Sequence, residues 1–381
     1  MMTVLQNSVS VDLGNLTQYE FLALNSPLNL SDGHARQELT AGQARIVEEL
    51  PALWADALKR PVAEVEADAR SAFFGLFGQH SYPRGEGRVL ACYSSSVAME
   101  IFARSLATVS DAIGLIHPTF DNIPDILRGV GLELLPIEED ELHHGDLDPY
   151  LMSRVGAIFV TTPNNPTGRV VPQERLRALA EQCARYDVVL ALDTCFRGFD
   201  TRAHYDHYEV LRESGCRWVV IEDTGKLWPT LELKIGWLVS AEDVGLPIEK
   251  VYSDILLGVS PLIMSMVRRL AEDAAGGGLA ELHEFIAGNR ALLRSALADV
   301  PDVHFLDPGS RASVERIGIG SRSNLAVWSA LSEHNVFALP CQKFFWADPA
   351  RGEGILRIAL ARPPASLAMG AAALRTVLSE S

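Results

Sequence analysis

One lysine in the sequence stands where a buried strand is expected to meet a polar turn. The apolar run 218–221 is typical of a strand, and the segment 222–226, Glu-Asp-Thr-Gly-Lys, follows it and ends in Lys226. A second cation, Lys234, follows shortly afterwards. A lysine held at a rigid strand end and shielded from water has a lowered pKa, which makes it a nucleophile able to form a Schiff base. Taken alone, the stretch is equally compatible with a surface turn that carries two solvated lysines.

Two further motifs precede this lysine. Asn-Asn-Pro-Thr-Gly at 164–168 follows an apolar strand and precedes a helix, and the strand 188–192 ends in Asp193. In order and spacing, these motifs with Lys226 and Lys234 resemble the fold-type I pyridoxal phosphate (PLP) enzymes of the class I/II aminotransferase superfamily. The resemblance covers nearly the whole chain. It implies an α/β fold with a large PLP-binding domain, built on a mostly parallel sheet, and a small α+β domain.

Alternating strands and helices must carry these residues. Thr40, with Gln43 as its capping-box partner, is expected to begin a helix that runs through Trp54. Strands and helices then alternate, which argues for a largely parallel sheet covered on both faces, with ligands bound beyond the carboxyl ends of the strands. We expect strands over 88–93, 113–116, 132–136, 155–161, 188–192 and 218–221, and helices over 61–77, 97–106, 123–129 and 173–186.

Three parts are expected along the chain. They are an N-terminal arm or lid over 1–39, a large PLP-binding domain over 40–285, and a small C-terminal domain over 286–381 that packs with the N-terminal segment. The arm is polar, and its residues 15–24 are expected to form a short amphipathic helix. A mobile arm is the default for a chain end. Three glycines at 276–278 mark a break between two long helices.

Composition excludes several classes of protein. The 381 residues carry a formal net charge of -16, which argues against nucleic acids and anionic membranes as partners. The five cysteines are scattered with no CxxC pair, so we expect no metal site, no disulfide framework and a reducing cytoplasm. The chain start lacks the pattern of a signal peptide, and no apolar run reaches membrane-spanning length.

The resemblance assigns roles in cofactor binding to residues at the strand ends. Lys226 is the Schiff-base lysine and moves the α-proton of the substrate. Asp193 lies against the pyridine nitrogen and keeps it protonated, so that the ring can accept electrons. Asn165 hydrogen-bonds the ring O3′, and Phe120 stacks on the pyridine ring. A core phenylalanine at a strand end is the alternative for Phe120.

Ser94, Ser95 and Ser96 lie between a strand and a helix, and the resemblance makes them the phosphate-binding loop. Free N–H groups at a helix N-terminus favour an anion there, although ordinary serine N-capping gives the same pattern. Lys234 completes the phosphate site at a position where most family members carry arginine. Arg357, within Leu-Arg-Ile-Ala, matches the family arginine that grips the substrate α-carboxylate. A surface arginine on an edge strand is the alternative for Arg357.

Two departures from the aminotransferase pattern narrow the prediction. Phe196 stands after Asp193 where aminotransferases usually carry a tyrosine that reaches O3′. Asp223 stands before Lys226 where a serine or threonine commonly helps to bind phosphate. A carboxylate repels phosphate, so we expect Asp223 to face a cationic substrate side chain. Both departures argue against plain transamination.

A small subgroup shares these departures, namely the PLP-dependent, oxygen-using L-arginine oxidases and hydroxylases of actinomycete pathways to non-proteinogenic amino acids. The resemblance implies that the enzyme oxidises L-arginine with dioxygen and releases hydrogen peroxide and ammonia. The implied products are 4-hydroxy-2-oxo-arginine and the abortive 2-oxo-arginine, and the implied assembly is a homodimer. The segments that carry this resemblance are 15–18, 22–26, 32–37, 94–96, 196–200 and 223–230.

The guanidinium of arginine is charged at every working pH, so its pocket needs carboxylates. The candidates are Glu20, Asp32 and Asp223, with Thr17 as a further hydrogen-bond partner. Because most of them lie on the arm, we expect the substrate to order the arm as a lid that excludes water. His34 is expected to act as a general acid or base near C4 of the substrate. A simple hydrogen bond within the turn or lid is the alternative.

Other reactions on this scaffold stay open at this point. An ordinary aminotransferase acting on a basic or aromatic amino acid needs a 2-oxo acid co-substrate and releases no peroxide. A decarboxylase or a cyclising dehydratase differs in the mass of its product. A non-catalytic PLP-binding regulator is disfavoured because the chain is acidic and shows no appended DNA-binding domain.

Overall fold

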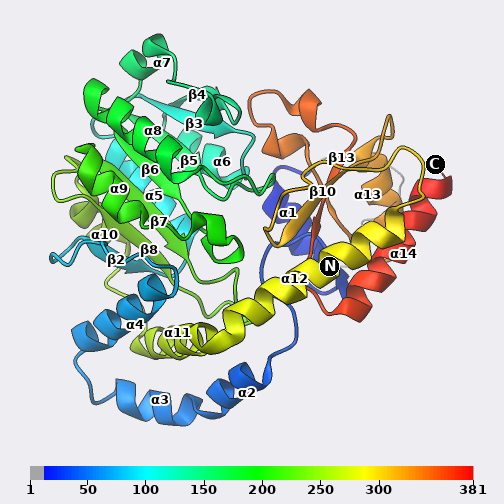
Figure 1. Cartoon of the computed structure of the whole chain (residues 1–381), viewed down its shortest axis with the longest axis horizontal. Helices are drawn as coiled ribbons and strands as arrows, with labels where there is room; N and C mark the ends of the chain where they lie inside the picture. Colours follow the sequence, from blue (N-terminus) through cyan, green and yellow to red (C-terminus); the bar gives the residue numbers. More distant parts are fainter. Residues whose placement is uncertain (1–12, 381) are drawn as a thin grey trace.

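The computed structural model describes residues 13–380 and consists of a larger part built on a seven-stranded sheet and a smaller part built on a four-stranded sheet (Figure 1). Long helix α12 (Leu279–Leu297) runs from the larger part to the smaller one. Across the large sheet the strand order is β2 (Val89–Cys92), β8 (Gly236–Ser240), β7 (Trp218–Asp223), β6 (Val189–Asp193), β5 (Ala157–Thr161), β3 (Ala112–His117) and β4 (Glu133–Glu138).

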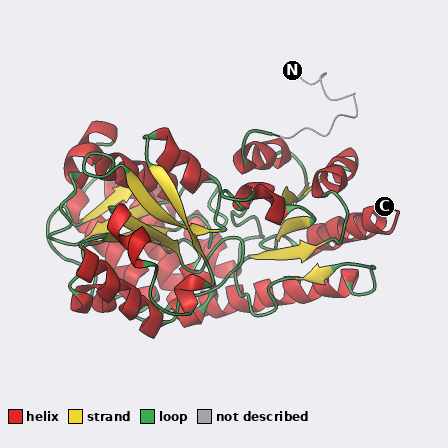
Figure 2. Ribbon diagram, turned by 90° about the horizontal axis from the view of Figure 1, so that it is seen from above, coloured by secondary structure: helices red, strands yellow, loops and turns green. Residues whose placement is uncertain are grey.

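The large sheet is parallel except at β8, which pairs antiparallel with both β2 and β7. All residues of β3, β5, β6 and β7 are buried, as expected for strands covered on both faces. Figure 2 shows helices on both sides of these strands. The helices of this part are α4 (Val62–Leu76), α5 (Ser95–Leu106), α6 (Asn122–Gly129), α7 (Pro149–Arg154), α8 (Gln173–Tyr186), α9 (His207–Ser214), α10 (Ile248–Ile255) and α11 (Pro261–Asp273).

The predicted α/β fold with a mostly parallel sheet is confirmed, and local differences have local causes. The single helix expected from Thr40 through Trp54 is two helices, α2 (Ala41–Glu48) and α3 (Leu50–Ala57), because Pro51 stands in the first turn of a new helix. The capping box of Thr40 and Gln43 is present. The glycine break is a π-helical turn, Ala274–Gly278, at which Gly277 has a φ of 130°. Strand β8 and helices α7, α9 and α10 were not predicted.

The smaller part combines both ends of the chain. Its four-stranded sheet has the order β12 (Leu339–Pro340), β13 (Ile355–Ala359), β10 (Val314–Gly318) and β9 (His304–Phe305), with helices α13 (Asn324–Glu333) and α14 (Pro364–Glu380) beside it. Near the N-terminus, β1 (Leu28–Asn29) pairs in parallel with β11 (Val336–Phe337). Helix α1 (Leu16–Ala23) packs Tyr19 edge-on against Trp328, with ring centroids 5.0 Å apart. The expected arm is therefore packed from residue 13 onward, and the predicted domain boundaries stay a prediction.

A buried ion pair holds the loop after β6 against β7. Arg197 and Glu222 are each about fully buried, and their Nη2 and Oε1 atoms lie 2.9 Å apart. The hydroxyl of Tyr208 donates to the same carboxylate at 3.0 Å. Since Glu222 precedes Asp223 and Arg197 follows Asp193 closely, the pair fixes the two strand ends that form the site described below.

Breaking this pair is expected to destabilise the protein strongly. Arg197→Met leaves the Glu222 carboxylate buried and unpaired, which we expect to lower the free energy of unfolding by about 3–5 kcal/mol. The measurement is urea denaturation followed by circular dichroism. The matched control is Arg177→Met, which breaks the exposed pair with Glu213 and is expected to cost at most about 1 kcal/mol. An equal loss in the free energy of unfolding for the two variants would contradict the stabilising role of the buried pair.

Candidate active site

The lysine candidate lies in the turn between β7 and β8. Thr224 fixes this turn, because its N–H donates to the carbonyl of Ile235 at 3.0 Å and its hydroxyl accepts from the N–H of Ile235 at 2.8 Å. Lys226 itself is half-buried and makes no hydrogen bond or ion pair with any other residue in the range 13–380. An amine held in place without a partner is available for covalent bonding to a carbonyl carbon.

Asp193 ends the neighbouring strand β6 and lies in register with Ile221 of β7. Its carboxylate is buried and accepts from the N–H of Cys195 at 3.0 Å. Burial raises the pKa of Asp193 to about 6, although hydrogen bonding with Cys195 acts to lower it. A cation placed against this carboxylate would favour its ionised form, and a protonated pyridine nitrogen is such a cation.

Ser94, Ser95 and Ser96 form the N-terminal turn of α5 at the same edge of the sheet. Ser94 is the N-cap, and its hydroxyl accepts from the N–H of Val97 at 3.3 Å. Gly236 lets strand β8 approach this turn, since a Cβ at that position would lie 2.3 Å from the carbonyl carbon of Ser94. The close approach brings the helix N-terminus to the carboxyl ends of the strands, where its N–H groups suit an anion such as phosphate.

Asp223 faces this serine turn. Its Oδ2 accepts from the hydroxyl of Ser95 at 2.7 Å and from the N–H of Ser95 at 3.2 Å, and its Oδ1 accepts from the N–H of Gly225. Burial opposes the ionisation of Asp223, but the charges of Lys226 and Lys234 and these hydrogen bonds outweigh it and lower its pKa. The structure therefore keeps Asp223 as a charged group beside the turn expected to bind phosphate.

Arg357, Asn165 and Glu20 form a second cluster, in which the arm meets strand β13. The guanidinium of Arg357 is wholly buried, and it donates from Nη1 to Oδ1 of Asn165 at 3.1 Å and from Nη2 to Oε1 of Glu20 at 3.2 Å. Its Cζ lies 5.8 Å from the ring centroid of Phe120. Burial raises the pKa of Glu20, although the charges of Arg357 and Lys226 oppose it. These contacts bring four predicted site residues together.

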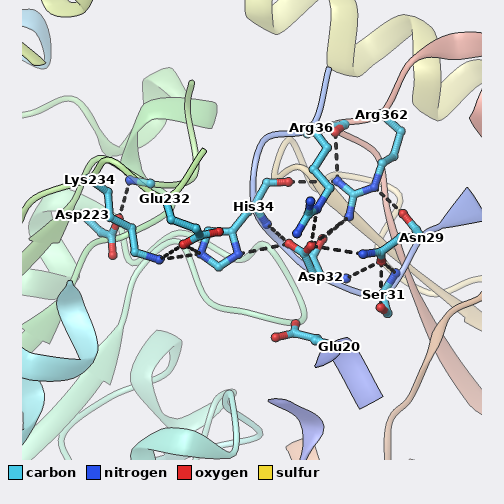
Figure 3. A network of polar contacts seen from close by, with 12 residues as sticks. Glu20, Asn29, Ser31, Asp32, His34, Arg36, Asp223, Glu232, Lys234 and Arg362 are labelled. Carbon is cyan, nitrogen blue, oxygen red and sulfur yellow. Dashed lines mark hydrogen bonds and ion pairs between the residues drawn. The ribbon is translucent and has the colours of Figure 1, made fainter. Parts of the chain in front are cut away.

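Asp32 and His34 form a third cluster, on the turn that follows β1 (Figure 3). The Nδ1 of His34 lies 3.1 Å from Oδ1 of Asp32, and its Nε2 lies 2.9 Å from the Nζ of Lys234. Because an ammonium can only donate, Nε2 carries a lone pair and Nδ1–H donates to Asp32. The charge of Lys226 lowers the pKa of His34, and burial adds to the effect, so the ring is neutral near pH 7.

The carboxylate of Asp32 is already bound within the protein. Burial opposes its ionisation, but the hydrogen bond with His34 and the charges of Arg362 and Arg36 hold its pKa below its usual range. The Nε of Arg36 donates to Oδ2, and the Nδ2 of Asn29 donates to the same oxygen at 3.3 Å. Asp32 therefore orients His34 in this structure and has little capacity left for a substrate guanidinium.

Three predicted site residues do not lie where their expected roles place them. Figure 3 shows Asp223 separated from Asp32 by Lys234 and His34, so the expected grouping of the three carboxylates is not what the structure shows. Lys234 bonds Glu232 at 2.6 Å, as well as His34, rather than a serine of the phosphate turn. Thr17 is exposed and lines a cavity of about 380 Å³ between the start of α1 and helices α5 and α6.

Sequence reasoning missed Arg362, which holds the turn that carries Asp32 and His34. It is buried, and it donates from Nε to the carbonyl of Asn29, from Nη2 to that of Asp32, and from Nη1 to that of His34 at 2.9 Å (Figure 3). Burial lowers the pKa of Arg362 to about 10. In the sequence, Arg362 is marked only as a second arginine shortly after Arg357, and such a pair of arginines is too common to indicate a functional role.

These residues fit pyridoxal phosphate. Lys226 is free to bind its aldehyde carbon, Asp193 can hold a protonated ring nitrogen, and the N-terminus of α5, where Asp223 bonds Ser95, lies at the same edge of the sheet for the phosphate. Within residues 13–380, no group of three or more histidine, cysteine, aspartate and glutamate side chains is placed to hold a metal ion. None of the helices in that range has the length and apolar character needed to cross a bilayer.

Comparison with known families decides the relationship. The model of the family aminotransferase class I and II matches residues 62–374 of this chain. The chain belongs to this family. Family membership implies PLP as the cofactor. Solved aminotransferases share its fold, for example the aspartate aminotransferase of Thermus thermophilus with maleate, which has a TM-score of 0.77 at 18% identity over 97% of both chains.

A much closer match is the solved structure of MppP soaked with the product 2-ketoarginine. It is 61% identical, has a TM-score of 0.91, and covers 92% of this chain and 99% of that chain. The aromatic amino acid aminotransferase of Rhodococcus jostii is 24% identical over 78% of this chain and 82% of that protein. Human kynurenine–oxoglutarate transaminase 1 is 28% identical over 46% of this chain, and the match spans less than half of the human enzyme, 45%.

Proposed function

We propose that the protein is a PLP- and oxygen-dependent oxidase and hydroxylase of L-arginine. It oxidises L-arginine with dioxygen, releases ammonia and hydrogen peroxide, and yields 4-hydroxy-2-oxo-arginine and 2-oxo-arginine. The observation that carries the proposal is the 61% identity to MppP, whose structure was soaked with 2-ketoarginine. At this identity over 99% of that chain, the same substrate class is expected.

The ion pair between Glu20 and Arg357 supports a substrate with two opposite charges. Arg357 is buried, Glu20 is 14% exposed, and the two are bonded to each other, so a ligand that separates them must replace both partners. The α-carboxylate of L-arginine offers Arg357 a bidentate anion, and its guanidinium offers Glu20 a cation. An amino acid with a neutral or acidic side chain offers Arg357 a carboxylate but offers Glu20 no cation, so the charge of Glu20 is left without compensation.

The other residues of the site then hold or move protons. When bound, PLP supplies the ring that accepts the electron pair of the substrate α-carbon. Lys226 takes the α-proton, because its amine is positioned and makes no other bond in residues 13–380. Asp193 stabilises the positive ring nitrogen. Helix α1 covers Arg357 through Glu20 and is expected to exclude water when the substrate is bound.

His34 is the residue expected to decide between the two products. Its neutral ring carries a lone pair on Nε2, which accepts from Lys234 in this structure, and Asp32 stabilises the positive charge that the ring gains on taking a proton. A base in this state can activate a water molecule for addition at C4 of the substrate. Loss of the base should leave oxidation possible and halt the hydroxylation.

We therefore expect His34→Phe to lower the hydroxylated share of the product at least about tenfold. Oxygen uptake should continue, with 2-oxo-arginine as the main product. Mass spectrometry of the reaction mixture measures the ratio of the two 2-oxo acids. The control is His144→Phe, which changes an exposed histidine on the carbonyl of Asp140. An unchanged product ratio in His34→Phe would show that His34 only forms hydrogen bonds in its turn and does not act as a base in the hydroxylation.

A homodimer is part of the proposal. An apolar cavity of about 870 Å³ lies between residues 34–50 and 225–234, close to His34 and Lys234. Around it Leu231 is 93% exposed and Trp54 is 57% exposed, a large apolar area for a free surface. A second copy of this chain would cover it beside the site, as the family resemblance implies. Analytical ultracentrifugation gives the mass, and a monomer would refute this part.

A cytoplasmic location is also proposed. All five cysteines are free and buried, which suits a reducing compartment. Burial raises the pKa of Cys92 and of Cys341 to about 12, so these thiols are unreactive.

The substrate is tested by presenting L-arginine, L-citrulline and L-lysine to the PLP-loaded protein and measuring peroxide and ammonia. L-Citrulline has the shape of L-arginine without the charge, so it separates charge recognition from size. We expect turnover with L-arginine and little with L-citrulline. Equal turnover of both would refute the guanidinium-binding role of Glu20, and no peroxide from any of them would refute the oxidase.

A further inference from the structure

Asp121 joins the expected cofactor site to the arm helix. It follows Phe120 and is the N-cap residue of α6, yet its side chain does not cap that helix. Instead, its Oδ2 accepts from the N–H of Leu16 at 2.6 Å, across 105 positions of the sequence. The residue is 4% exposed, and its other oxygen, Oδ1, is buried without a hydrogen-bond partner among the described residues.

The N–H of Leu16 belongs to the first residue of α1. The first N–H groups of a helix have no partner within the helix, and the helix dipole places positive charge there. Asn15 satisfies one of them, because its side chain accepts from the N–H of Gln18 at 3.0 Å. Asp121 satisfies another at the positive end of α1. Its carboxylate thus fastens this end of the helix to α6.

The two neighbours of Asp121 contact the rest of the site. Phe120, which is expected to stack on the pyridine ring, lies under Arg357. Asn122 donates from Nδ2 to the hydroxyl of Ser96 at 3.1 Å, in the turn expected to bind phosphate. Of three consecutive residues, the first is expected to face the pyridine ring, Asp121 bonds the arm, and the third bonds the turn expected to bind phosphate. A shift of α1 would therefore act on residues next to the expected cofactor site.

We propose that Asp121 is the positioning residue that docks helix α1 over the active site and so sets the affinity for the substrate. The Leu16 contact lies at the first residue of α1, and the contact of Glu20 with Arg357 lies one helical turn further along. Without the hydrogen bond between Asp121 and Leu16, the helix can tilt away from the site, which weakens the contact of Glu20 with Arg357. The identity of the substrate rests on the proposed function, whereas the docking of α1 does not.

The charges around Asp121 make this docking depend on pH. Burial raises the pKa of Asp121 to about 7, against the hydrogen bond from Leu16. Asp125 on α6 and Glu20 on α1 raise the pKa further, and Lys343 lowers it. Glu100 on α5 lines the same cavity as Asp121 and Asp125, where it is paired with Arg104.

The direction in which pH changes the docking of α1 follows from the pKa of Asp121 in the docked and undocked states. Undocked, the carboxyl group meets water and has its usual pKa, near 4. Docking then takes up a proton at any pH between that value and about 7. Docking is therefore strongest below the usual pKa, weakens as the pH rises towards 7, and changes no further above it.

Three variants test the proposal in the PLP-loaded enzyme with L-arginine. Asp121→Ala removes the hydrogen bond, Asp121→Asn keeps an acceptor and removes the charge, and Asp125→Asn makes the same charge change on the same helix at a half-exposed carboxylate. Two readouts are the KM for L-arginine from peroxide release and the amide hydrogen exchange of residues 16–23 with L-arginine bound. Cofactor absorbance is recorded for each variant.

We expect Asp121→Ala to raise the KM about tenfold, with a smaller change in kcat, and to lose the protection of α1 from exchange. Asp121→Asn keeps the acceptor and cannot ionise, so its KM should stay near the wild-type value at pH 5 and should not show the rise in KM that the wild type shows between pH 5 and pH 7. At pH 5, where Asp121 is largely protonated in both proteins, Asp125→Asn should match the wild type. The cofactor absorbance should be unchanged in all three.

Two results would overturn the proposal. The first is a KM and an exchange pattern of Asp121→Ala equal to those of Asp125→Asn. The second is loss of the cofactor absorbance in Asp121→Asn, which would make Asp121 a part of the cofactor site. A wild type that releases no peroxide, but whose α1 is protected by L-arginine and exposed in Asp121→Ala, would refute the proposed function and support the docking role.

Discussion

Alanine in place of Lys226 is expected to lower peroxide release from L-arginine by about ten-thousandfold or more. Lys226 is the amine that can bind the cofactor covalently and also take the α-proton, so both functions are lost together. Lys226 makes no hydrogen bond or ion pair with other described residues, so its removal breaks no direct contact, and Lys234 and the hydrogen bonds from Ser95 and Gly225 still favour the ionised form of buried Asp223. The fold should therefore survive, with an unchanged thermal unfolding midpoint.

Two measurements separate this outcome from simple damage. Gel filtration should remove PLP from Lys226→Ala and leave it bound to the wild type, because the covalent link is lost. The control is Lys250→Ala, whose exposed side chain pairs with Asp254 and which should keep full activity. A rate in Lys226→Ala above about one hundredth of the wild type would contradict the assignment of this lysine.

Arg357→Met is expected to raise the KM for L-arginine by about a hundredfold. The substitution removes the cation expected to bind the α-carboxylate, and it leaves Glu20 buried without its partner. Arg357→Lys should recover part of the effect, because lysine supplies charge without the bidentate fork. Peroxide release as a function of L-arginine concentration measures these changes.

A double variant separates substrate binding from the loss of the ion pair. Arg357→Met with Glu20→Gln removes both charges, so no unpaired charge stays buried, and the thermal stability lost in Arg357→Met should largely return. The KM should stay high, since neither charged end of the substrate then has a partner. Recovery of the KM in the double variant would show that Arg357 stabilises the arm and does not bind the substrate.

Strand ends were predictable because their signals are local. The apolar runs before Lys226 and Asp193 are continuous, and β6 and β7 are buried throughout, as such runs indicate. Parallel strands end at one edge of a sheet, so the two residues were expected to lie together. Helices α9 and α10 were not predicted, although the hydrophobic residues of α10 lie along one face, and each is only eight residues long.

Side-chain partners were not predictable, because they come from distant parts of the chain. Asp223 bonds Ser95, which lies 128 positions away, and Lys234 bonds His34, which lies 200 positions away. The residue types indicated chemistry but not which groups would meet. Asp32 was expected to bind the substrate, and two arginines instead engage it in this structure.

The most direct test of the account is oxygen uptake by the PLP-loaded protein with L-arginine and no 2-oxo acid. An oxygen electrode records the uptake, and mass spectrometry identifies the products at the end. We predict sustained uptake, with hydrogen peroxide, ammonia and both 2-oxo acids formed. No uptake, followed by turnover of L-arginine once a 2-oxo acid is added, would contradict the account and assign the protein to transamination.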